Sequence, residues 1–308
     1  MTVDAPTLHA IVAEWYARNA RDLPWRRAPF LGDPYAVLVS EIMLQQTQVD
    51  RTIPKFLEFM ARFPSIESLA EATSGEVITL WAGMGYNGRA VRLQRLASVV
   101  VGELGGVLPS KPNELRALPG VGPYTASAVA SFAFGATVPV LDTNVFRVLS
   151  RLVHGAKAPS RAEVEPLATE LLPGADGPLD GSTWHQALMD LGASLCTSNG
   201  PRCLLCPLRE HCAAAPELQG GADRETASAS VPYTPTQSTF VGSHRFYRGR
   251  IVEGLRAAKN DGLRIDEIGA ELKEDFGGAE DRAWLGAIID ALVRDGLAVE
   301  NDGVLRLP

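Results

Sequence analysis

The sequence predicts an all-α protein that ends in a small winged-helix-like domain, and three observations support this fold class. Residues 1–213 hold one apolar run after another at helical spacing, as in 8–16 and 36–44. Helix breakers such as Gly105 and Gly106 separate these runs, and little strand-like alternation is found. Toward the end of the chain, further helical patterns precede two short apolar runs around an Asn-Asp-Gly turn.

Composition narrows the class of protein. The chain has 308 residues, of which 46% are hydrophobic, which suits one large or two modest globular domains. No apolar run approaches the roughly 18 residues that a membrane-spanning helix needs, and the first residues lack the basic-then-apolar order of a signal peptide. We therefore expect a soluble, cytoplasmic protein with no membrane partner.

The charge is distributed unevenly. A formal net charge of −7 by itself argues against a nucleic-acid partner, because proteins that neutralise phosphates are ordinarily basic. Most of the excess of acidic over basic residues lies in residues 214–308, which hold 11 basic and 16 acidic residues. Residues 1–213 are close to neutral, so a local basic face is compatible with the sequence. The candidates for that face are Arg51, Lys55, Arg89, Arg92 and Arg95.

We predict three segments along the chain. Residues 1–213 form the helical domain, residues 214–244 are a linker rich in small, polar and proline residues, and residues 245–308 form the last domain. Three helices closed by a hairpin are typical of a winged helix. The helical patterns of this domain lie near 246–258, 264–275 and 280–295.

A glycine-rich turn joins two amphipathic helical patterns within residues 113–130. Glycines let the backbone approach a ligand closely, and the amides that open the second helix can bind a phosphate. We therefore predict a helix-hairpin-helix that holds a DNA backbone without reading its sequence, in preference to an ordinary tight turn. The turn consists of Leu118, Pro119, Gly120, Val121 and Gly122.

Two carboxylates are candidates for catalysis. Asp142 precedes Asn144 and a helical pattern, so it is either a plain helix N-cap or an anion that stabilises a sugar cation. Glu41 has apolar neighbours on both sides in sequence, so it lies either on a solvated stripe or in a buried site as a general acid. Gln45 and Gln46 carry amides that can fill a gap in a base stack or bind a base edge.

All four cysteines lie within 17 residues, in a C-x6-C-x2-C-x5-C pattern. Scattered disulfides of a secreted protein do not look like this, so we interpret the group as a metal site. Four thiolates suit tetrahedral zinc and a four-cysteine iron–sulfur cluster equally well, and the spacing alone leaves both open. The candidate ligands are Cys196, Cys203, Cys206 and Cys212.

Six segments carry motifs in the order and spacing of one known family. They are Leu23–Arg26, Ser40–Val49, Trp81–Tyr86, Leu118–Gly122, Leu141–Leu149 and the cysteine loop 196–212. Over roughly residues 10–213 the chain resembles adenine DNA glycosylases of the MutY type, in the helix-hairpin-helix superfamily that also contains endonuclease III. The resemblance implies a helix-hairpin-helix DNA glycosylase fold, with two helical subdomains and a loop that binds a [4Fe-4S] cluster.

The resemblance also implies roles for particular residues. Glu41 matches the catalytic acid that protonates adenine at N7, so that the base leaves as a neutral molecule. Asp142 matches the aspartate that steadies the sugar cation and assists the attacking water, and Asn144 matches an asparagine close to it. Arg26 and Gln186 resemble residues that line the adenine pocket.

Three further positions take their interpretation from the same resemblance. Gln46 and Tyr86 resemble side chains that enter the base stack near the mispaired purine, since the target nucleotide must be flipped out of the duplex. Tyr124 stands where bifunctional relatives similar to endonuclease III have a lysine that forms a Schiff base. Because tyrosine cannot form one, we expect removal of a base that leaves an abasic site.

Two features depart from the family pattern. The usual Nudix-like C-terminal module, which recognises 8-oxoguanine, is not visible, and about 64 residues with a winged-helix pattern stand in its place. Asn87 follows Tyr86 where a second tyrosine is common. Residues 245–308 hold 10 basic and 13 acidic residues, so we expect them to bind a protein partner or to pack, with phosphate contacts limited to their first helix. The basic cluster there is Arg245, Arg248 and Arg250.

The leading prediction is a monofunctional DNA glycosylase of base excision repair. It would hydrolyse the N-glycosidic bond of adenine mispaired with 8-oxoguanine or guanine in double-stranded DNA, as a nucleoid-associated monomer. A thymine or uracil mismatch glycosylase on the same scaffold is the nearest alternative, and Glu41 argues against it because only a purine needs a proton at N7. A non-catalytic DNA-binding redox regulator is another, which the presence of both Glu41 and Asp142 disfavours.

Overall fold

The computed structural model describes residues 4–156, 159–174, 176–219, 239–259 and 261–308. The chain divides into two compact units. Unit 1 comprises residues 1–37, 110–116 and 122–235, and unit 2 comprises residues 38–109, 117–121 and 236–308. In the part of the chain that the structure describes, no helix is long and apolar enough to cross a membrane.

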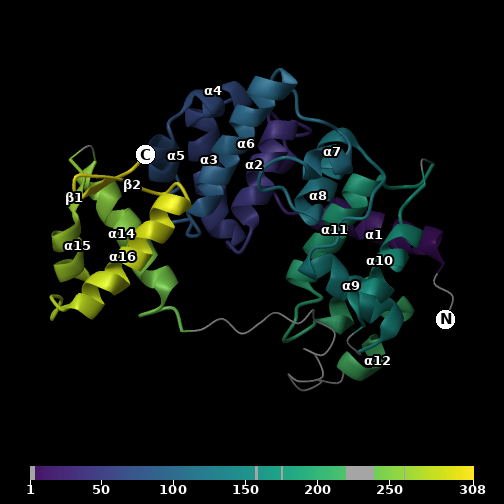
Figure 1. Ribbon diagram of the computed structural model, residues 1–308. Helices are drawn as coiled ribbons and strands as arrows, with labels where there is room; N and C mark the ends of the chain where they lie inside the picture. Colours follow the sequence, from purple (N-terminus) through teal and green to yellow (C-terminus); the bar gives the residue numbers. More distant parts are fainter. Residues whose placement is uncertain (1–3, 157–158, 175, 220–238, 260) are drawn as a thin grey trace. The chain divides into compact units, whose positions relative to one another are not determined.

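Unit 1 consists of helices around one apolar core (Figure 1). Helices α9 and α11 pack against each other, and α1, α8 and α10 each contact one of this pair. Trp184, Leu188 and Leu152 are fully buried between them. The elements are α1 (Ala5–Asn19), η1 (Pro24–Arg26), α7 (Pro112–Arg116), α8 (Pro123–Phe134), α9 (Thr143–His154), α10 (Arg161–Glu170), α11 (Gly181–Ser194), η2 (Cys203–Leu205), η3 (Arg209–His211) and α12 (Ala215–Leu218).

Side-chain caps fix where several of these helices begin. Asp4, Asp142 and Asp180 are the N-caps of α1, α9 and α11, and each carboxylate accepts a hydrogen bond from a backbone N–H of the first turn. Helix α8 starts with a proline, which suits the first helical position, and ends at Gly135 in the left-handed conformation. Asp142 is therefore a helix cap, and this role holds its carboxylate in place.

The first part of unit 2 is a group of helices in which α4 and α5 pack on α6. Phe59 makes edge-to-face contacts with Phe63 and Trp81 inside this group. Capping boxes at Ser65 and Thr73 begin α4 and α5. The elements are the end of α2 (Pro34–Leu44), which starts in unit 1, and α3 (Val49–Arg62), α4 (Ile66–Glu71), α5 (Ser74–Leu80) and α6 (Gly88–Leu104).

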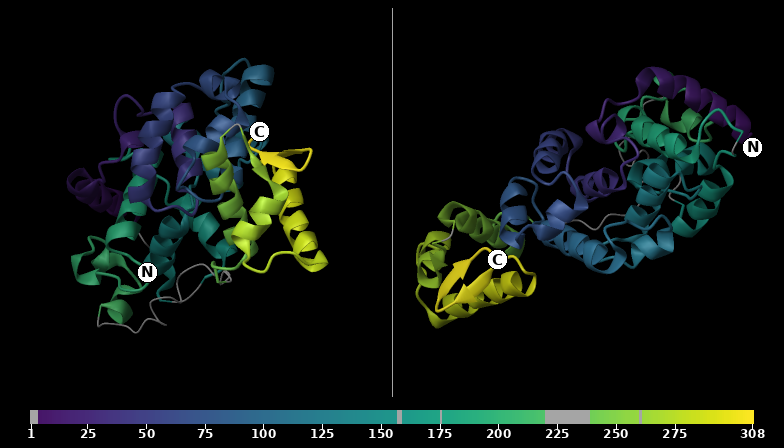
Figure 2. Two further views of the ribbon diagram at one scale, coloured as in Figure 1. Left: turned by 90° about the vertical axis from the view of Figure 1, so that its left-hand side faces the viewer. Right: turned by 90° about the horizontal axis from the view of Figure 1, so that it is seen from above.

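The second part of unit 2 has the order of a winged helix. A hairpin follows three helices, and a short strand before the second helix joins it, so that the antiparallel sheet has the order β1-β3-β2. Leu305 on the central strand lies opposite both Leu263 and Glu300. Figure 2 shows this sheet folded against the C-terminal helices. The elements are α14 (His244–Ala258), β1 (Leu263–Arg264), α15 (Ile265–Leu272), α16 (Ala279–Arg294), β2 (Val299–Asn301) and β3 (Val304–Arg306).

The predicted fold class is confirmed, since helices dominate the described residues and strands occur in the C-terminal sheet. The predicted order of three helices and a hairpin is confirmed as well. Strand β1 was not predicted, because two residues carry no periodic pattern. Most of the predicted linker, residues 220–238, lies outside the described residues, and the segment boundaries at 213 and 245 stay a prediction.

Candidate active site and cysteine loop

Asp142 is held at the start of α9 by two donors. Its Oδ1 accepts a hydrogen bond from the backbone N–H of Val145 at 2.6 Å, and its Oδ2 accepts one from the side-chain amide of Asn144 at 2.8 Å. Burial outweighs these bonds and raises the pKa of Asp142 above its ordinary value. A partly buried carboxylate whose orientation is fixed suits the stabilisation of a positive charge that develops in a substrate.

Arg147 connects this carboxylate with the cysteine loop. Its Nη2 donates to Asn144 Oδ1 and to the carbonyl oxygen of Gly192, both at 2.8 Å, and its Nε donates to the carbonyl oxygen of Cys196 at 2.6 Å. Glycine is needed at position 192, because a Cβ there would lie 2.6 Å from Asn144 Cβ. Asp142, Asn144, Arg147 and Cys196 thus form one hydrogen-bonded chain within unit 1.

A buried histidine anchors the segment that leads to Asp142. The Nε2 atom of His185, in α11, accepts a hydrogen bond from the backbone N–H of Val140 at 3.0 Å. Burial lowers the pKa of His185 to about 4, so the ring is neutral near pH 7 and can accept at Nε2. The contact fixes the backbone two residues before the candidate carboxylate.

Arg26 and Gln186, the predicted lining of the base pocket, share one polar network. Arg26 Nη1 donates to both carboxylate oxygens of Asp190, at 3.0 and 2.8 Å, and to the Tyr16 hydroxyl at 3.5 Å. Tyr16 donates to Gln186 Oε1 at 3.3 Å. Asp190 is 1% exposed and also pairs with Arg21. The structure therefore brings the two predicted residues together within unit 1.

Sequence reasoning missed Tyr16 and Asp190. Each occupies an ordinary position of an amphipathic helix, α1 or α11, and only the packing of these two helices places them beside Arg26. Burial is the main cause of the raised pKa of Tyr16, which therefore stays a hydroxyl donor at neutral pH. The available signal was an Asp among apolar neighbours four residues after Gln186, since a carboxylate that becomes buried needs a partner.

The glycine-rich turn has the geometry of a helix-hairpin-helix. Helices α7 and α8 pack against each other, and Leu118 and Val121 in the turn are buried. Gly120 has a φ of +78°, which favours glycine, and a Cβ there would lie only 3.1 Å from Arg92 Cβ. Gly122 is the N-cap of α8 and supplies no capping side chain, which leaves the opening amides of α8 without such a competitor for a phosphate.

Tyr124 lies in the first turn of α8, directly after this hairpin. It is partly buried and packs against the core of unit 1. A tyrosine has no amine, so the position cannot supply the nucleophile of a Schiff base.

Glu41 lies in the middle of α2 and is only 7% exposed. The residues on either side of it, Ser40 and Ile42, are buried as well, so this stretch of α2 has no solvated stripe at Glu41. A buried carboxyl group is costly unless it is protonated or hydrogen-bonded, which is compatible with the expected role of a general acid. Gln45, one turn later, is partly buried.

Gln46 and Tyr86 share an unusual backbone conformation. Their φ angles are +54° and +45°, and both residues are exposed. A non-glycine residue in this left-handed region costs about 1–2 kcal/mol, and such strain is concentrated at functional sites. Among the described residues other than glycine, only Lys259 and Asp302 also have a positive φ. The sequence contained no signal for this strain.

Arg89 supports both strained residues from inside unit 2. Its guanidinium is buried, and burial lowers the pKa of Arg89 to about 10, so the group stays charged at neutral pH. It lies 5.4 Å from the ring centre of Trp81 and 5.8 Å from that of Tyr86. Its acceptors, at 2.6–3.2 Å, are the carbonyl oxygens of Ile42, Met43, Gln45, Met84 and Gly85 and the hydroxyl of Thr47.

The prediction that Arg89 belongs to a basic DNA-facing surface is wrong. Main-chain oxygens at the end of α2 and in the segment before Tyr86 accept hydrogen bonds from its Nη1 and Nη2 groups in the interior, and the side chain is 4% exposed. A basic residue in an amphipathic helix is usually a surface residue, and the sequence offers no sign of these acceptors. Arg92 and Arg95, on the same helix, are exposed.

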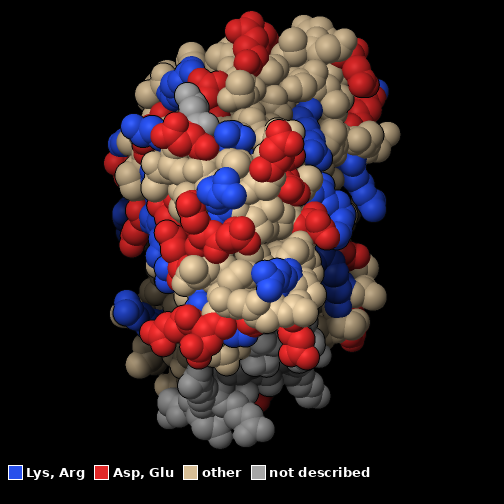
Figure 3. Space-filling view, turned by 60° about the vertical axis from the view of Figure 1, so that its left-hand side comes forward, with Lys and Arg blue, Asp and Glu red and all other residues tan. Residues whose placement is uncertain are grey.

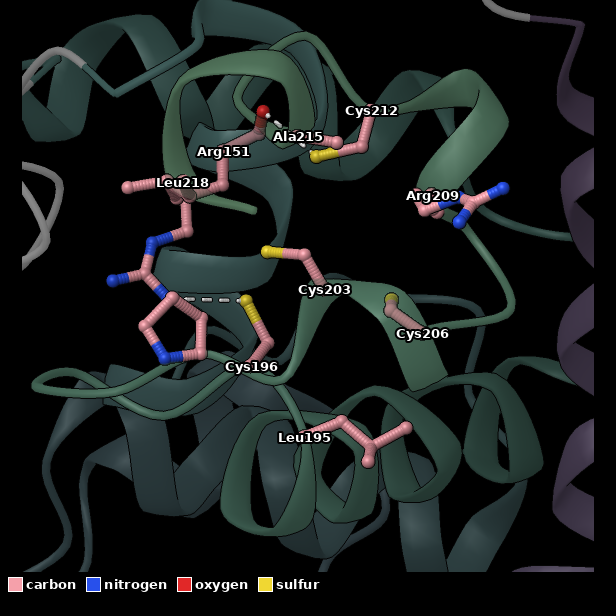
Figure 4. Close-up of a pocket in the computed structure, with 10 residues that line it drawn as sticks. Arg151, Leu195, Cys196, Cys203, Cys206, Arg209, Cys212, Ala215 and Leu218 are labelled. Atoms are coloured by element: carbon pink, nitrogen blue, oxygen red, sulfur yellow. Dashed lines mark hydrogen bonds between the residues drawn. The ribbon is translucent and has the colours of Figure 1, made fainter. Parts of the chain in front are cut away.

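The four cysteines line one pocket with mostly apolar walls (Figure 4). The sulfur atoms of Cys196, Cys203 and Cys212 point toward the same space, and Cys206 completes the lining. Burial raises the pKa of the Cys206 thiol to about 12 and that of Cys212 to about 11. Arg151 is 1% exposed and donates from Nη1 to the sulfur of Cys196 at 3.3 Å.

The donor set of this pocket fits a thiolate-bound metal centre. Four thiols in an apolar pocket become thiolates when a metal displaces their protons, and Arg151 supplies a positive charge beside them. The described residues contain no group of three or more His, Cys, Asp or Glu side chains placed to hold a single metal ion. Backbone bonds tie the loop to α9, from Ala213 to Leu152 and from Ala214 to Arg151, at 2.9 and 3.0 Å.

The predicted site residues fall into two sets, one in each unit. The sets are Arg26, Tyr124, Asp142, Asn144, Gln186 and the four cysteines in unit 1, and Glu41, Gln45, Gln46, Tyr86, Leu118, Gly120 and Val121 in unit 2. Gly122 begins the next stretch of unit 1. Within each unit the contacts above connect several members of the set.

The C-terminal helices present a mixed surface. Figure 3 brings forward the side of Figure 1 on which α15 and α16 lie, and acidic patches there alternate with single basic side chains. Arg248, from the predicted basic cluster, forms an ion pair with Asp295. The expectation that most of this domain does not bind phosphates remains a prediction.

Comparisons with known proteins relate this chain to one family. Residues 39–174 match the model of the family described as HhH-GPD superfamily base excision DNA repair protein. An adenine DNA glycosylase of Mycolicibacterium smegmatis is 39% identical over 296 residues, which cover 95% of this chain and 93% of that protein. The adenine DNA glycosylase of Homo sapiens is 41% identical over 227 residues, covering 72% of this chain and 41% of the human protein.

A solved structure has a similar fold. The structure of a thermostable thymine-DNA glycosylase superposes with a TM-score of 0.62 at 28% sequence identity. The match covers 69% of this chain and 97% of that one.

Proposed function

We propose that this chain, which belongs to the adenine DNA glycosylases of the HhH-GPD superfamily, hydrolyses the N-glycosidic bond of adenine mispaired with 8-oxoguanine or guanine in double-stranded DNA. The observation that carries the proposal is the desolvated carboxylate of Asp142, fixed by Val145 and Asn144. Relatives that span nearly the whole chain carry the name of this activity.

Glu41 is the proposed general acid. A buried, protonated carboxyl group donates its proton to N7 of the flipped adenine, which turns the base into a good leaving group. The bond between C1′ of the sugar and N9 of the base then breaks, and its electron pair leaves with the base. The sugar is left as an oxocarbenium ion.

Asp142 is the proposed counter-ion of that cation. Its negative charge stabilises the oxocarbenium ion, and its free lone pairs can accept a proton from the water that attacks C1′. Asn144 donates to the carboxylate and so keeps it oriented. The products are free adenine and an abasic site, in which the water oxygen has replaced N9.

The reaction is monofunctional. Strand cleavage by the relatives with a Schiff-base lysine requires an amine where this chain has Tyr124. An intact strand with an abasic site is therefore the expected product.

Arg26 and Gln186 are the proposed walls of the adenine pocket. Because Asp190 and Tyr16 hold the Arg26 guanidinium and the Gln186 amide, these polar groups can present a fixed hydrogen-bond pattern to the edge of the base. The glycine turn at Gly120 and Gly122 is the proposed phosphate contact, and one copy of the chain suffices for this chemistry.

The cysteine loop is proposed to hold a [4Fe-4S] cluster. Cys196, Cys203, Cys206 and Cys212 would be its ligands, and the cluster would fix the fold of the loop rather than take part in the chemical step. Zinc is the alternative, because four thiolates also suit it, although the described side chains are not placed around a single ion. Iron, acid-labile sulfide and zinc analysis of the purified protein distinguishes the two.

A second candidate function is removal of thymine from T:G mispairs. The observation that favours it is the similarity to the thermostable thymine-DNA glycosylase, which covers 97% of that chain. Glu41 weighs against it, since a pyrimidine offers no N7 to protonate.

The experiment is a single-turnover assay on four duplexes: A opposite 8-oxoguanine, A opposite G, T opposite G and U opposite G. Each reaction is split and analysed with and without alkali, which cleaves abasic sites. We expect product only from the two adenine duplexes and only after alkali. Release of thymine or uracil would overturn the substrate assignment, and cleavage without alkali would overturn the monofunctional reaction.

A further inference from the structure

The C-terminal domain of unit 2 is packed onto α5 and α6 through a shared core. Ile78 of α5 and Val91 of α6 belong to the same buried apolar cluster as Ile251, Val252 and Leu255 of α14. Gly296 fits against α6, where a Cβ would lie 2.6 Å from Arg95 Nη2 and 3.3 Å from Val91 Cγ1. The C-terminal domain therefore shares a core with the helices next to Tyr86 in unit 2, and a change in its packing can shift these helices.

Arg256 is the polar centre of this contact. Its side chain is 9% exposed, and from α14 it reaches across to α5. Nε and Nη2 donate to the carbonyl oxygen of Ile78 at 3.1 and 2.8 Å, and Nη2 also donates to Asn87 Oδ1 at 2.8 Å. Nη1 donates to Glu253 at 2.8 Å, which partly balances the buried charge.

The two acceptors of Arg256 mark the two ends of one segment. Ile78 lies in the last turn of α5, whose carbonyl groups need partners from outside the helix, and Asn87 is the N-cap of α6. Residues 79–86, with the strained Tyr86, lie between them. Arg89 binds the same segment through the carbonyl oxygens of Met84 and Gly85. Two buried guanidinium groups thus define the path of this segment.

Asn87 does not cap its helix in the usual way. Asparagine at an N-cap usually accepts a hydrogen bond from the first turn of its own helix. Asn87 makes no such bond, and its backbone has helical angles, with φ −53° and ψ −24°. Its side-chain oxygen is bound to Arg256 instead. Without this hydrogen bond, Asn87 loses the contact that ties its end of the segment to the C-terminal domain.

We infer that the C-terminal domain acts, through the contact of Arg256 with Asn87, as a positioning element that holds Tyr86 in its left-handed conformation and thereby sets the choice of base opposite the adenine. The inference rests on the proposed function. The inference also connects the two departures from the family pattern. Asn87 stands where a second tyrosine is common, and the winged-helix-like domain binds it through Arg256.

The test compares two rate constants in each variant: single-turnover excision of adenine opposite 8-oxoguanine and opposite guanine. In Arg256→Met, which keeps an apolar stem without donors, we expect the ratio of the two rates to fall about fivefold, with the rate opposite guanine nearly unchanged. Asn87→Ala is expected to lower the ratio equally, and the double variant is expected to be no worse than either single one. Asn87→Asp keeps an acceptor for Arg256 and is expected to keep the ratio.

Lys273→Met is the matched control, because it removes an ion pair with Asp281 that lies wholly inside the C-terminal domain. Its ratio is expected to equal that of the unaltered protein. If Arg256→Met fails to fold, the pair Asn87→Ala and Asn87→Asp carries the test, since Asn87 lies in a partly exposed segment.

Three results would overturn the inference. They are an unchanged ratio in folded Arg256→Met and Asn87→Ala, an equal loss on both duplexes, and a ratio near 1 in the unaltered protein. Failure of the proposed function looks different, because the unaltered protein would then release no adenine from either duplex.

Discussion

Two buried arginines, one in each unit, hold candidate site residues in place by different kinds of contact. Arg147 in unit 1 belongs to a series of hydrogen bonds that ends at an ionisable group, the carboxylate of Asp142, which it reaches through the amide of Asn144. Arg89 in unit 2 binds main-chain carbonyl oxygens and a hydroxyl, and through them it fixes the backbone of two exposed residues. Both guanidinium groups are less than a tenth exposed.

The two arginine networks are therefore expected to affect different properties of the protein, the chemical step and the backbone conformation. The network around Arg147 adjusts the charge and orientation of a carboxylate, so damage to it is expected to change the rate and the pH dependence of the chemical step. The network around Arg89 maintains the backbone conformation of Gln46 and Tyr86. Substitutions in it are expected to lower the free energy of unfolding and to disturb contacts with the DNA bases. The predictions below test this division.

Among the residues of these two networks, the largest effect is expected from Asp142→Asn. Asparagine keeps the shape and a capping oxygen but lacks the charge that would stabilise the oxocarbenium ion, so single-turnover excision of adenine should fall by about 10³-fold or more. Binding of the mismatched duplex should change little. The measurement is the rate constant for alkali-labile product with enzyme in excess.

Asp180→Asn is the matched control, since Asp180 also caps a helix of unit 1 by accepting from a backbone N–H. Its rate should stay within about twofold of the unaltered protein. Equal losses in both variants would mean that Asp142 matters only as a cap.

Arg89→Met should give the next largest effect. Removal of the guanidinium leaves several buried carbonyl oxygens without a donor, so the free energy of unfolding should fall by about 3 kcal/mol. Denaturant unfolding measures this change. Arg62→Met removes an exposed pair with Glu76 and should cost less than about 0.5 kcal/mol. Similar values for the two variants would remove Arg89 from its assigned role.

A third prediction concerns pH and His185. The folded-state pKa of His185 is lowered to about 4 from an ordinary value of 6.5, so the unfolded chain binds a proton first as the pH falls. This contribution to stability is present above about pH 6.5 and is lost on the way down to pH 4, where the loss reaches about 3 kcal/mol.

His185→Gln isolates this contribution, because glutamine can accept from the Val140 N–H but does not titrate. Unfolding free energies are measured for both proteins from pH 4 to pH 8. The difference between them should shrink, or change sign in favour of the variant, as the pH falls. A difference independent of pH would show that the ring does not stay neutral in the folded protein.

The smallest effect is expected from Asn144→Ala. The variant loses a donor to the Asp142 carboxylate, so burial raises the pKa of Asp142 further. The acid side of the pH–rate profile should move to higher pH, and the rate at neutral pH should fall by about tenfold. An unshifted profile with a uniformly lower rate would mean that Asn144 contacts the substrate rather than the carboxylate.

Candidate site residues could be recognised from the sequence where they lie close together along the chain. The cysteine loop, the glycine turn around Gly120 and the carboxylate before Asn144 are each short segments whose residues can be recognised together. The hairpin of the last domain was also predictable, because an Asn-Asp-Gly turn between apolar runs has one common structure. Helix α2 was predicted as a helix, and its apolar character agrees with the burial of Glu41.

Contacts between distant segments could not be predicted. Tyr16 and Asp190 meet Arg26 only after α1 packs on α11, and Arg256 reaches Asn87 across 169 positions of sequence. Arg89 was placed on the surface, because an arginine whose acceptors are nearly all backbone atoms leaves little trace in the identity of its neighbours. The left-handed angles of Gln46 and Tyr86 are likewise imposed by the fold.

The most direct test of the central assignment is Glu41→Gln on the duplex with adenine opposite 8-oxoguanine. Glutamine keeps the size of the side chain but has no proton to give to N7, and Glu103→Gln, at an exposed position of α6, is the control. Single-turnover excision and duplex binding are measured for both. We predict that Glu41→Gln binds the duplex as the control does and releases no adenine. Excision at a rate close to that of the control would contradict the assignment of Glu41 as the general acid.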